Sequence, residues 1–245
     1  MSGVERVFGD WQRQNIQPPA FTAPPKPARR VVVIDKPDAV QTAVRVGQLG
    51  VPRKTNDYMA LDEAIRILGG EGSNRLFRVL RSDRSLTYSA SANMNTMLLS
   101  GDFVAETDTR SEVTGQAARL VVDEYWRLIR DRVSDGELNG AQNYMTGSFP
   151  LTIETPSAIA RQVVNVVFYD LSLDDLRTYR QRANAVTPED IQRVARSYLD
   201  PDRLSVVLVG DAGRFKDQLG RAGFGRYELI TLDELDLTSA DLKKH

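Results

Sequence analysis

The sequence has no cysteine and only one histidine, which is its last residue, His245. The missing cysteines exclude thiol catalysis, disulfide bonds and thiolate metal sites. A single histidine at the end of the chain excludes a Ser-His-Asp triad and a histidine-rich zinc site within these 245 residues. Any chemistry that the chain performs by itself therefore has to use carboxylates, tyrosine, lysine or arginine.

Long apolar segments and a charge bias are also missing. Residues 85–101 form the longest stretch without a charged residue, and they are rich in Ser, Thr and Asn, so we expect no membrane span. Residues 1–6 contain no apolar core of a secretory signal. The net charge is -1, from 32 basic and 33 acidic residues, which predicts no nucleic-acid partner. The lack of cysteine fits the periplasm and the cytoplasm equally well.

The composition is that of a soluble globular protein, with 41% apolar and 27% charged residues. Residues 1–29 differ from the rest, because prolines crowd between Pro18 and Pro27 and favour an extended chain. We interpret residues 1–29 as a linker from an upstream domain, with a surface strap as the alternative. Residues 30–245 are then the folded domain.

The hydrophobic pattern of this domain changes between strand and helix periods. Helical spacing predicts helices over residues 58–68, 74–82, 117–129, 135–147, 155–169, 173–184 and 188–198. Strand patterns cover residues 30–35, 40–49, 86–95, 102–108, 204–210 and 228–232. This order predicts an α+β fold, with one layer of helices packed on a largely antiparallel sheet.

Residues 86–95 alternate most clearly between apolar and polar side chains. Leu86, Tyr88, Ala90 and Ala92 fall on one face, which predicts a half-buried strand with Tyr88 on its apolar side. If this strand lies at an edge of the sheet, it can pair with an extended peptide. The sequence does not indicate which strand is at the edge.

Residues 69–73 are glycine-rich and precede a helix, so a phosphate-binding loop has to be considered. The Lys of a Walker motif is missing, and a predicted helix rather than a strand precedes the glycines. A junction between two helices, with Ser73 as the cap of the second, therefore accounts for the segment better. Four arginines then recur at every third position, and a solvated cationic helix face is the simplest interpretation of them. They are Arg75, Arg78, Arg81 and Arg84.

Several segments together resemble the insulinase-like (M16) zinc peptidases in order and spacing. The first part of the resemblance is Ile-Leu-Gly-Gly, Ser-Asn-Arg-Leu-Phe, Leu-Arg and Leu-Thr-Tyr-Ser, at residues 67–70, 73–77, 80–81 and 86–89. Further similar segments are residues 154–156, 186–191, 198–201 and 206–211. The resemblance spans about residues 30–212, and it implies the α+β half-domain of that family.

In that family the active half carries an inverted zinc motif, His-x-x-Glu-His, with a distal Glu. This chain has no such motif, so it resembles the zinc-free half. The resemblance implies that the two halves close around an unfolded peptide. It further implies that this chain binds no cofactor, that zinc belongs to the partner half, and that the partners are a zinc-bearing M16 domain or subunit and a peptide substrate.

The resemblance also implies that the zinc-free half supplies an Arg and a Tyr, seven residues apart, to the completed site. Arg81 and Tyr88 have this spacing. Zinc-activated water attacking a peptide carbonyl creates an oxyanion, which the N–H and O–H donors of such a pair stabilise. The simpler alternative is that Tyr88 is a half-buried strand residue and Arg81 a surface residue.

We therefore expect a domain that is not catalytic alone but completes the peptide-binding chamber of a zinc metalloendopeptidase. The first alternative is an inactive assembly subunit of the same fold, like the core subunits of respiratory complexes. The second is a small-molecule enzyme that uses carboxylates, although the adjacent acidic residues fall on helical patterns where solvated charge is expected.

Overall fold

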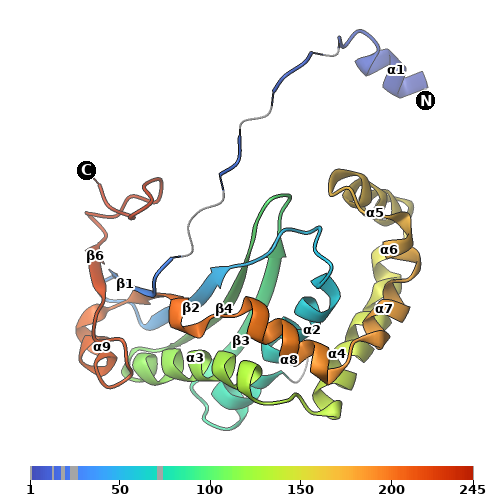
Figure 1. Ribbon diagram of the computed structural model, residues 1–245. Coiled ribbons are helices and arrows are strands. Elements are labelled where there is room, and N and C mark those ends of the chain that lie inside the picture. The colour runs from blue at the N-terminus through green and yellow to red at the C-terminus, as the bar shows by residue number, and fades with distance from the viewer. Residues whose placement is uncertain (1, 13, 18–19, 23–26, 71–73, 245) are drawn as a thin grey trace.

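The computed structural model describes residues 2–12, 14–17, 20–22, 27–70 and 74–244. A helix, α1 (Ser2–Phe8), stands apart from the rest at the end of an extended N-terminal segment (Figure 1). Nearly all described residues before residue 30 are exposed. Part of the predicted linker, residues 18–19 and 23–26, lies outside the described residues, and the domain boundary at residue 30 stays a prediction.

In the described chain, six strands form one sheet: β1 (Arg30–Asp35), β2 (Gln41–Leu49), β3 (Thr87–Thr96), β4 (Gly101–Arg110), β5 (Ser205–Gly210) and β6 (Glu228–Thr231). Their order across the sheet is β3-β4-β2-β5-β1-β6. β2 is antiparallel to β4 and β5, and β3 is antiparallel to β4. β1 is parallel to both of its neighbours, β5 and β6. The fold is α+β, as predicted, with a mixed sheet whose edge strands are β3 and β6.

Four helices cover one face of this sheet: α2 (Tyr58–Gly69), α3 (Thr114–Arg130), α8 (Pro188–Tyr198) and α9 (Ala212–Leu219). Alternate residues of the central strands, such as Val44 and Val46 on β2 and Phe103 on β4, are buried beneath them. The buried Tyr125 of α3 donates a hydrogen bond of 3.4 Å to the carbonyl of Val46. One contiguous core therefore lies between the sheet and the helices.

The chain leaves this core in an arm, which we define as residues 135–185. Its elements are α4 (Asp135–Ser148), η3 (Phe149–Ile153), α5 (Pro156–Phe168), α6 (Leu173–Arg177) and α7 (Tyr179–Ala185). Figure 1 shows α4 and α7 beside α2, and α5 at the far end. A small cluster of Met59, Met145 and Ala183 joins the base of the arm to α2.

Two predicted helices differ from the expectation in detail. Residues 173–184 fall in two helices, because α6 ends at Arg177 and α7 begins at Tyr179. Thr178 caps the end of α6, and its hydroxyl donates to the carbonyl of Asp174 at 2.6 Å. The helix expected over residues 74–82 is present but is wound as a π-helix, η1 (Phe77–Ser82). Asn74 caps the start of the whole helical segment, which begins at residue 75, since its side-chain oxygen accepts a 2.7 Å hydrogen bond from the N–H of Phe77. The predicted capping residue Ser73 lies outside the described residues.

Two helix ends have clear local causes. Thr187 caps α8 in a reciprocal capping box with Asp190, with Pro188 in the first turn. Gly69 ends α2 where the helix touches β3: a Cβ at this position would lie 2.2 Å from the backbone nitrogen of Ala92. Within the described residues, no helix combines the length and the apolarity that a membrane span requires.

Candidate functional site

Tyr88 does not lie on the apolar face where the alternation of residues 86–95 predicts it. Thr87 pairs with Thr109 and Ala90 with Thr107, so Tyr88 and Ser89 together oppose only Asp108. This β-bulge shifts the alternation by one residue. Leu86, Ala90 and Ala92 remain buried, whereas Tyr88 is 80% exposed. The predicted orientation of Tyr88 is therefore wrong, and its phenol is accessible from outside the domain.

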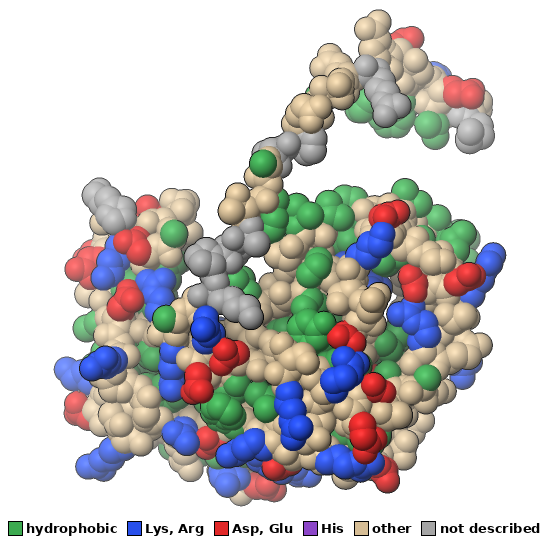
Figure 2. Space-filling view, in the orientation of Figure 1, with side chains coloured by type: hydrophobic (Ala, Val, Ile, Leu, Met, Phe, Trp, Pro, Cys, Tyr) green, Lys and Arg blue, Asp and Glu red, His purple; other side chains and the backbone are tan. Residues whose placement is uncertain are grey.

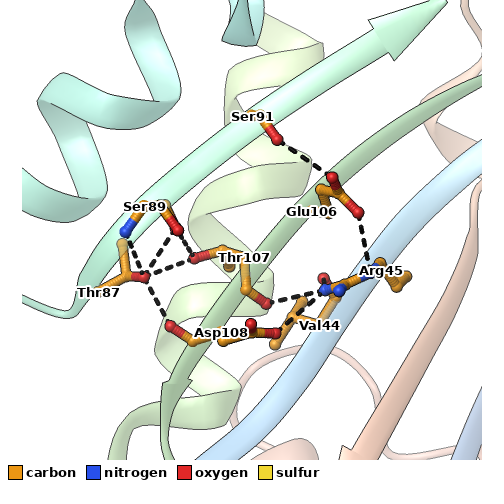
Figure 3. A network of polar contacts seen from close by, with 8 residues as sticks. All are labelled: Val44, Arg45, Thr87, Ser89, Ser91, Glu106, Thr107 and Asp108. Atoms are coloured by element: carbon orange, nitrogen blue, oxygen red, sulfur yellow. Dashed lines mark hydrogen bonds and ion pairs between the residues drawn. The ribbon is translucent and has the colours of Figure 1, made fainter.

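Hydroxyl groups of β3 and β4 hold the bulge (Figure 3). Thr107 donates to the carbonyl of Ser89 at 2.8 Å, and Thr87 donates to the carbonyl of Asp108 at 2.6 Å. On β2, Arg45 reaches the carbonyl of Thr107 at 3.3 Å and forms ion pairs with Glu106 and Asp108. Thr87 and Ser89, on the two sides of Tyr88, are thus tied to β4, and Arg45 in turn ties β4 to β2.

Arg81 lies in the last turn of η1 and is exposed. Its Nη1 donates a 2.6 Å hydrogen bond to the backbone carbonyl of Tyr88, and its guanidinium carbon lies 5.0 Å from the ring centroid of Phe77. A guanidinium has five N–H groups. Among the described residues, no carboxylate forms an ion pair with Arg81. Arg81 therefore keeps donors that a ligand can use.

The structure brings Arg81 and Tyr88 together at one hollow of about 630 Å³. Sequence reasoning missed three polar side chains that line it, because they come from the start of β2 and from the end of β4. These are Gln41, Asp108 and Arg110. The register of the hairpin from β3 to β4 is the signal that would have placed Asp108 opposite Tyr88.

The donor set of this chain does not fit zinc. Zinc sites in proteins are built mainly from histidine and cysteine with carboxylates. The sequence has no cysteine, and its one histidine lies outside the described residues. In the described ranges, no group of three acidic residues is placed to hold an ion.

Of the four evenly spaced arginines, Arg75 contradicts the expected solvated face. It is only 3% exposed, and it holds Glu137 of α4 in a two-pronged ion pair with distances of 2.7 and 3.2 Å. Burial alone would raise the pKa of Glu137, but Arg75 and the backbone of Ser134 lower it to about 2. Arg75, two residues before η1, therefore fastens the start of this helical segment to the arm.

A second buried acid, Glu63 on α2, was also not singled out by its sequence pattern. It is completely buried between α2 and the base of the arm, and burial raises its pKa to about 8. The side chain of Gln142 on α4 lowers this pKa in part, although neither carboxyl oxygen makes a well-formed hydrogen bond within the described chain. Glu63 is consequently a neutral acid at pH 7.

Comparison with known proteins identifies the family. A sequence profile described as "Peptidase M16 inactive domain" matches residues 2–145. The chain belongs to this family. An uncharacterized zinc protease of Streptomyces coelicolor is 26% identical over 200 residues, which cover 80% of this chain and 42% of the relative.

Solved structures share the fold of this chain. The peptidase M16 inactive domain from Pseudomonas fluorescens has a TM-score of 0.73 and 27% identity, over 77% of this chain and 45% of that one. A chain of complex III2 from Candida albicans has a TM-score of 0.64 at 12% identity, over 79% and 49%, a likeness that shows the fold alone. This M16 chain thus spans less than half the length of the Streptomyces relative and of the Pseudomonas chain.

Proposed function

We propose that this chain is the zinc-free half of an M16-type metallopeptidase and that it completes the peptide-binding chamber of a zinc-bearing half. In the completed site, Arg81 and Tyr88 donate hydrogen bonds to the carbonyl oxygen of a bound peptide. One observation carries the proposal: both side chains are exposed at the same hollow, on backbone that is held by hydrogen bonds.

The chemistry of the pair suits this role. When a peptide bond is hydrolysed, negative charge develops on the carbonyl oxygen, and fixed donors aimed at that oxygen lower the barrier. A phenol O–H and a guanidinium N–H both donate, and a guanidinium has no lone pair with which to bind a metal. The hydrogen bond from Arg81 to the carbonyl of Tyr88 couples the two residues, so they move together when the halves close.

The edge strand offers a second contribution to peptide binding. β3 is the last strand on its side of the sheet, and between Ala90 and Thr96 it carries neither a charged residue nor a proline. Such residues protect the edge strands of many proteins from pairing. An extended peptide that adds to this edge would reach the hollow at the bulge, where Tyr88 lies.

The test is kinetic and uses the assembled two-half peptidase. Tyr88→Phe removes one donor and keeps the ring, so we expect kcat to fall on the order of a hundredfold, equivalent to about 3 kcal/mol. Arg81→Ala should lower kcat and also raise KM if the guanidinium grips the substrate in the ground state. Because both residues are exposed, the melting temperature should hardly change.

Two variants serve as matched controls. Arg84→Ala removes a neighbouring exposed arginine that does not line the hollow, and Tyr144→Phe removes a phenol hydroxyl on α4. Both should retain wild-type kinetics. If Tyr88→Phe and Arg81→Ala also retain wild-type kinetics in a folded complex, the pair has no catalytic role. The alternative of an assembly subunit with this fold would then be preferred.

A further inference from the structure

The longest helix at the far end of the arm exposes an apolar face. We define the α5 face as Ile159, Ala160, Val163, Val164, Val167 and Phe168, which lie within one half of the helix circumference at 100° per residue. All six are exposed, Val167 at 75% and Val164 at 62%. The α5 face contains no charged residue. Figure 2 shows hydrophobic side chains gathered over this end of the molecule.

Packing within the chain does not account for α5. Of its 13 residues only Val166 is buried, and its main neighbours, η3 and α6, belong to the same arm. Asp170, two residues after the end of α5, forms an ion pair with Lys54 in the loop before α2. This contact lies outside α5 and leaves the α5 face uncovered. Isolated helices of this length are marginal in water, and they owe their stability in proteins to a packed apolar face. The α5 face therefore calls for a cover that the described residues do not supply.

The length of the chain indicates what this cover is. The chain spans only 42% of the Streptomyces relative and 45% of the Pseudomonas chain, so more than half of each has no counterpart here. The α5 face has no charge with which to attract a peptide or nucleic acid by electrostatics. A large, uncharged apolar surface fits a permanent interface between folded domains.

We infer that the α5 face is the surface by which this chain binds the zinc-bearing half. The inference rests on the proposed function, because it takes the partner from it. It adds a place of contact far along the chain from Arg81 and Tyr88. The arm then acts as the anchor of the assembly, and the hollow at the bulge remains free for peptide.

Binding rather than activity tests this inference. The partner is the polypeptide with the His-x-x-Glu-His motif that is encoded upstream of this chain or beside it, and titration calorimetry measures the dissociation constant. Val164→Asp and Val167→Asp each place a charge in the proposed interface, so each should weaken binding about a hundredfold or more. Their melting temperatures should match the wild type, because the substituted side chains are exposed in this chain.

The matched control is Asn165→Asp. It introduces the same charge into the same helix, but two residues from Val167 and hence on the opposite side. It should bind like the wild type. Three results would each overturn the inference. The first is a loss of affinity in Asn165→Asp equal to that in the two valine variants, and the second is undiminished binding by Val164→Asp and Val167→Asp. The third is no binding by the wild-type chain at about 100 µM.

Two further measurements distinguish docking through the α5 face from the catalytic role of Tyr88 and from self-association. Tyr88→Phe should bind the partner with wild-type affinity while its turnover falls. A wild-type complex that forms with high affinity yet cleaves no peptide argues against the proposed function and not against docking through the α5 face. Sedimentation of the chain alone tests self-association. If the chain forms a dimer that Val167→Asp abolishes and that the zinc-bearing half does not displace, the α5 face belongs to a second copy and the inference fails.

Discussion

Replacing Glu63 by glutamine should change how the stability of the domain depends on pH. Glu63 is a completely buried acid whose pKa is raised to about 8, mainly by burial. In the unfolded chain the same carboxyl titrates near its ordinary value of about 4.3. Between these two values the folded state holds a proton that the unfolded state has lost, so the stability of the wild type falls as the pH rises.

The expected size follows from these two pKa values. Each pH unit between about 4.5 and 8 costs about 1.4 kcal/mol of unfolding free energy, so the total approaches about 4–5 kcal/mol at pH 8. Glutamine has nearly the same shape and does not titrate. The unfolding free energy of Glu63→Gln minus that of the wild type should therefore rise by roughly 4 kcal/mol between pH 5 and pH 8. At pH 5 the two proteins should differ little, because both carry a neutral group at this position.

Urea unfolding at pH 5, 6, 7 and 8 measures this difference, and other titrating groups cancel when the two proteins are compared at each pH. Glu154→Gln, at an exposed position in the arm, is the control and should show no trend. A difference for Glu63→Gln that stays constant within about 0.5 kcal/mol across this range would refute the reasoning. Glu63 would then be charged in the folded domain, with partners that the structure does not show.

Two other predictions concern packing and the buried ion pair. Gly69→Ala should destabilise the domain by about 1–3 kcal/mol, because the new Cβ meets the backbone of β3. Gly140→Ala on α4, where a Cβ meets nothing within 4 Å, should stabilise it by up to about 1 kcal/mol. Thermal unfolding of both variants checks this, and equal effects of the two substitutions would contradict it. Glu137→Gln leaves Arg75 buried without its partner and should cost about 3 kcal/mol at pH 7. The pKa of Glu137 is lowered to about 2 in the folded state, so its contribution to stability is present above about pH 4.5 and is lost as the pH falls toward 2. Urea unfolding should therefore show the unfolding free energies of the two proteins converging at low pH. A difference that stays constant with pH would count against the ion pair.

Elements with strong local signals could be predicted from the sequence. Residues 188–198 form a helix because Thr187, Pro188 and Asp190 supply the cap, the first-turn proline and the reciprocal hydrogen bond. Residues 31–34 are all β-branched and form the buried centre of strand β1. In both segments the local preference and the final packing agree, so the residues alone were sufficient to predict them.

The orientation of Tyr88 could not be predicted in the same way. Its apolar alternation with Leu86 and Ala90 is unbroken in the sequence, and the bulge depends on the hydroxyls of Thr87 and Thr107 and on the register with β4. The resemblance to the M16 family implied the pair of Arg81 and Tyr88, and the structure places both at one hollow, but their role in catalysis stays a prediction.

The buried charges were hidden for a related reason. Arg75 looks like its three neighbours in the sequence, and its burial depends on Glu137, which lies 62 residues further along the chain. Glu63 follows Asp62 on α2, so the two acids look equally solvated. Glu63 is completely buried, whereas Asp62 keeps a partly exposed side chain that pairs with Arg66 on the same helix. The burial of Glu63 arises where the arm packs against α2. Contacts between segments so far apart in the sequence leave no local pattern.

The place of β5 in the sheet determines when the domain can fold. β5 separates β1 from β2, although β1 and β2 follow each other directly in the chain, and Arg30 pairs with Ser205. During synthesis, β1 has no neighbour until residues 205–210 have emerged, and contacts that join such distant segments slow folding. The open edges of the incomplete sheet are exposed to other chains for that time. The shortest piece of the protein that can close its sheet between β3 and β1 therefore runs from residue 30 to residue 210.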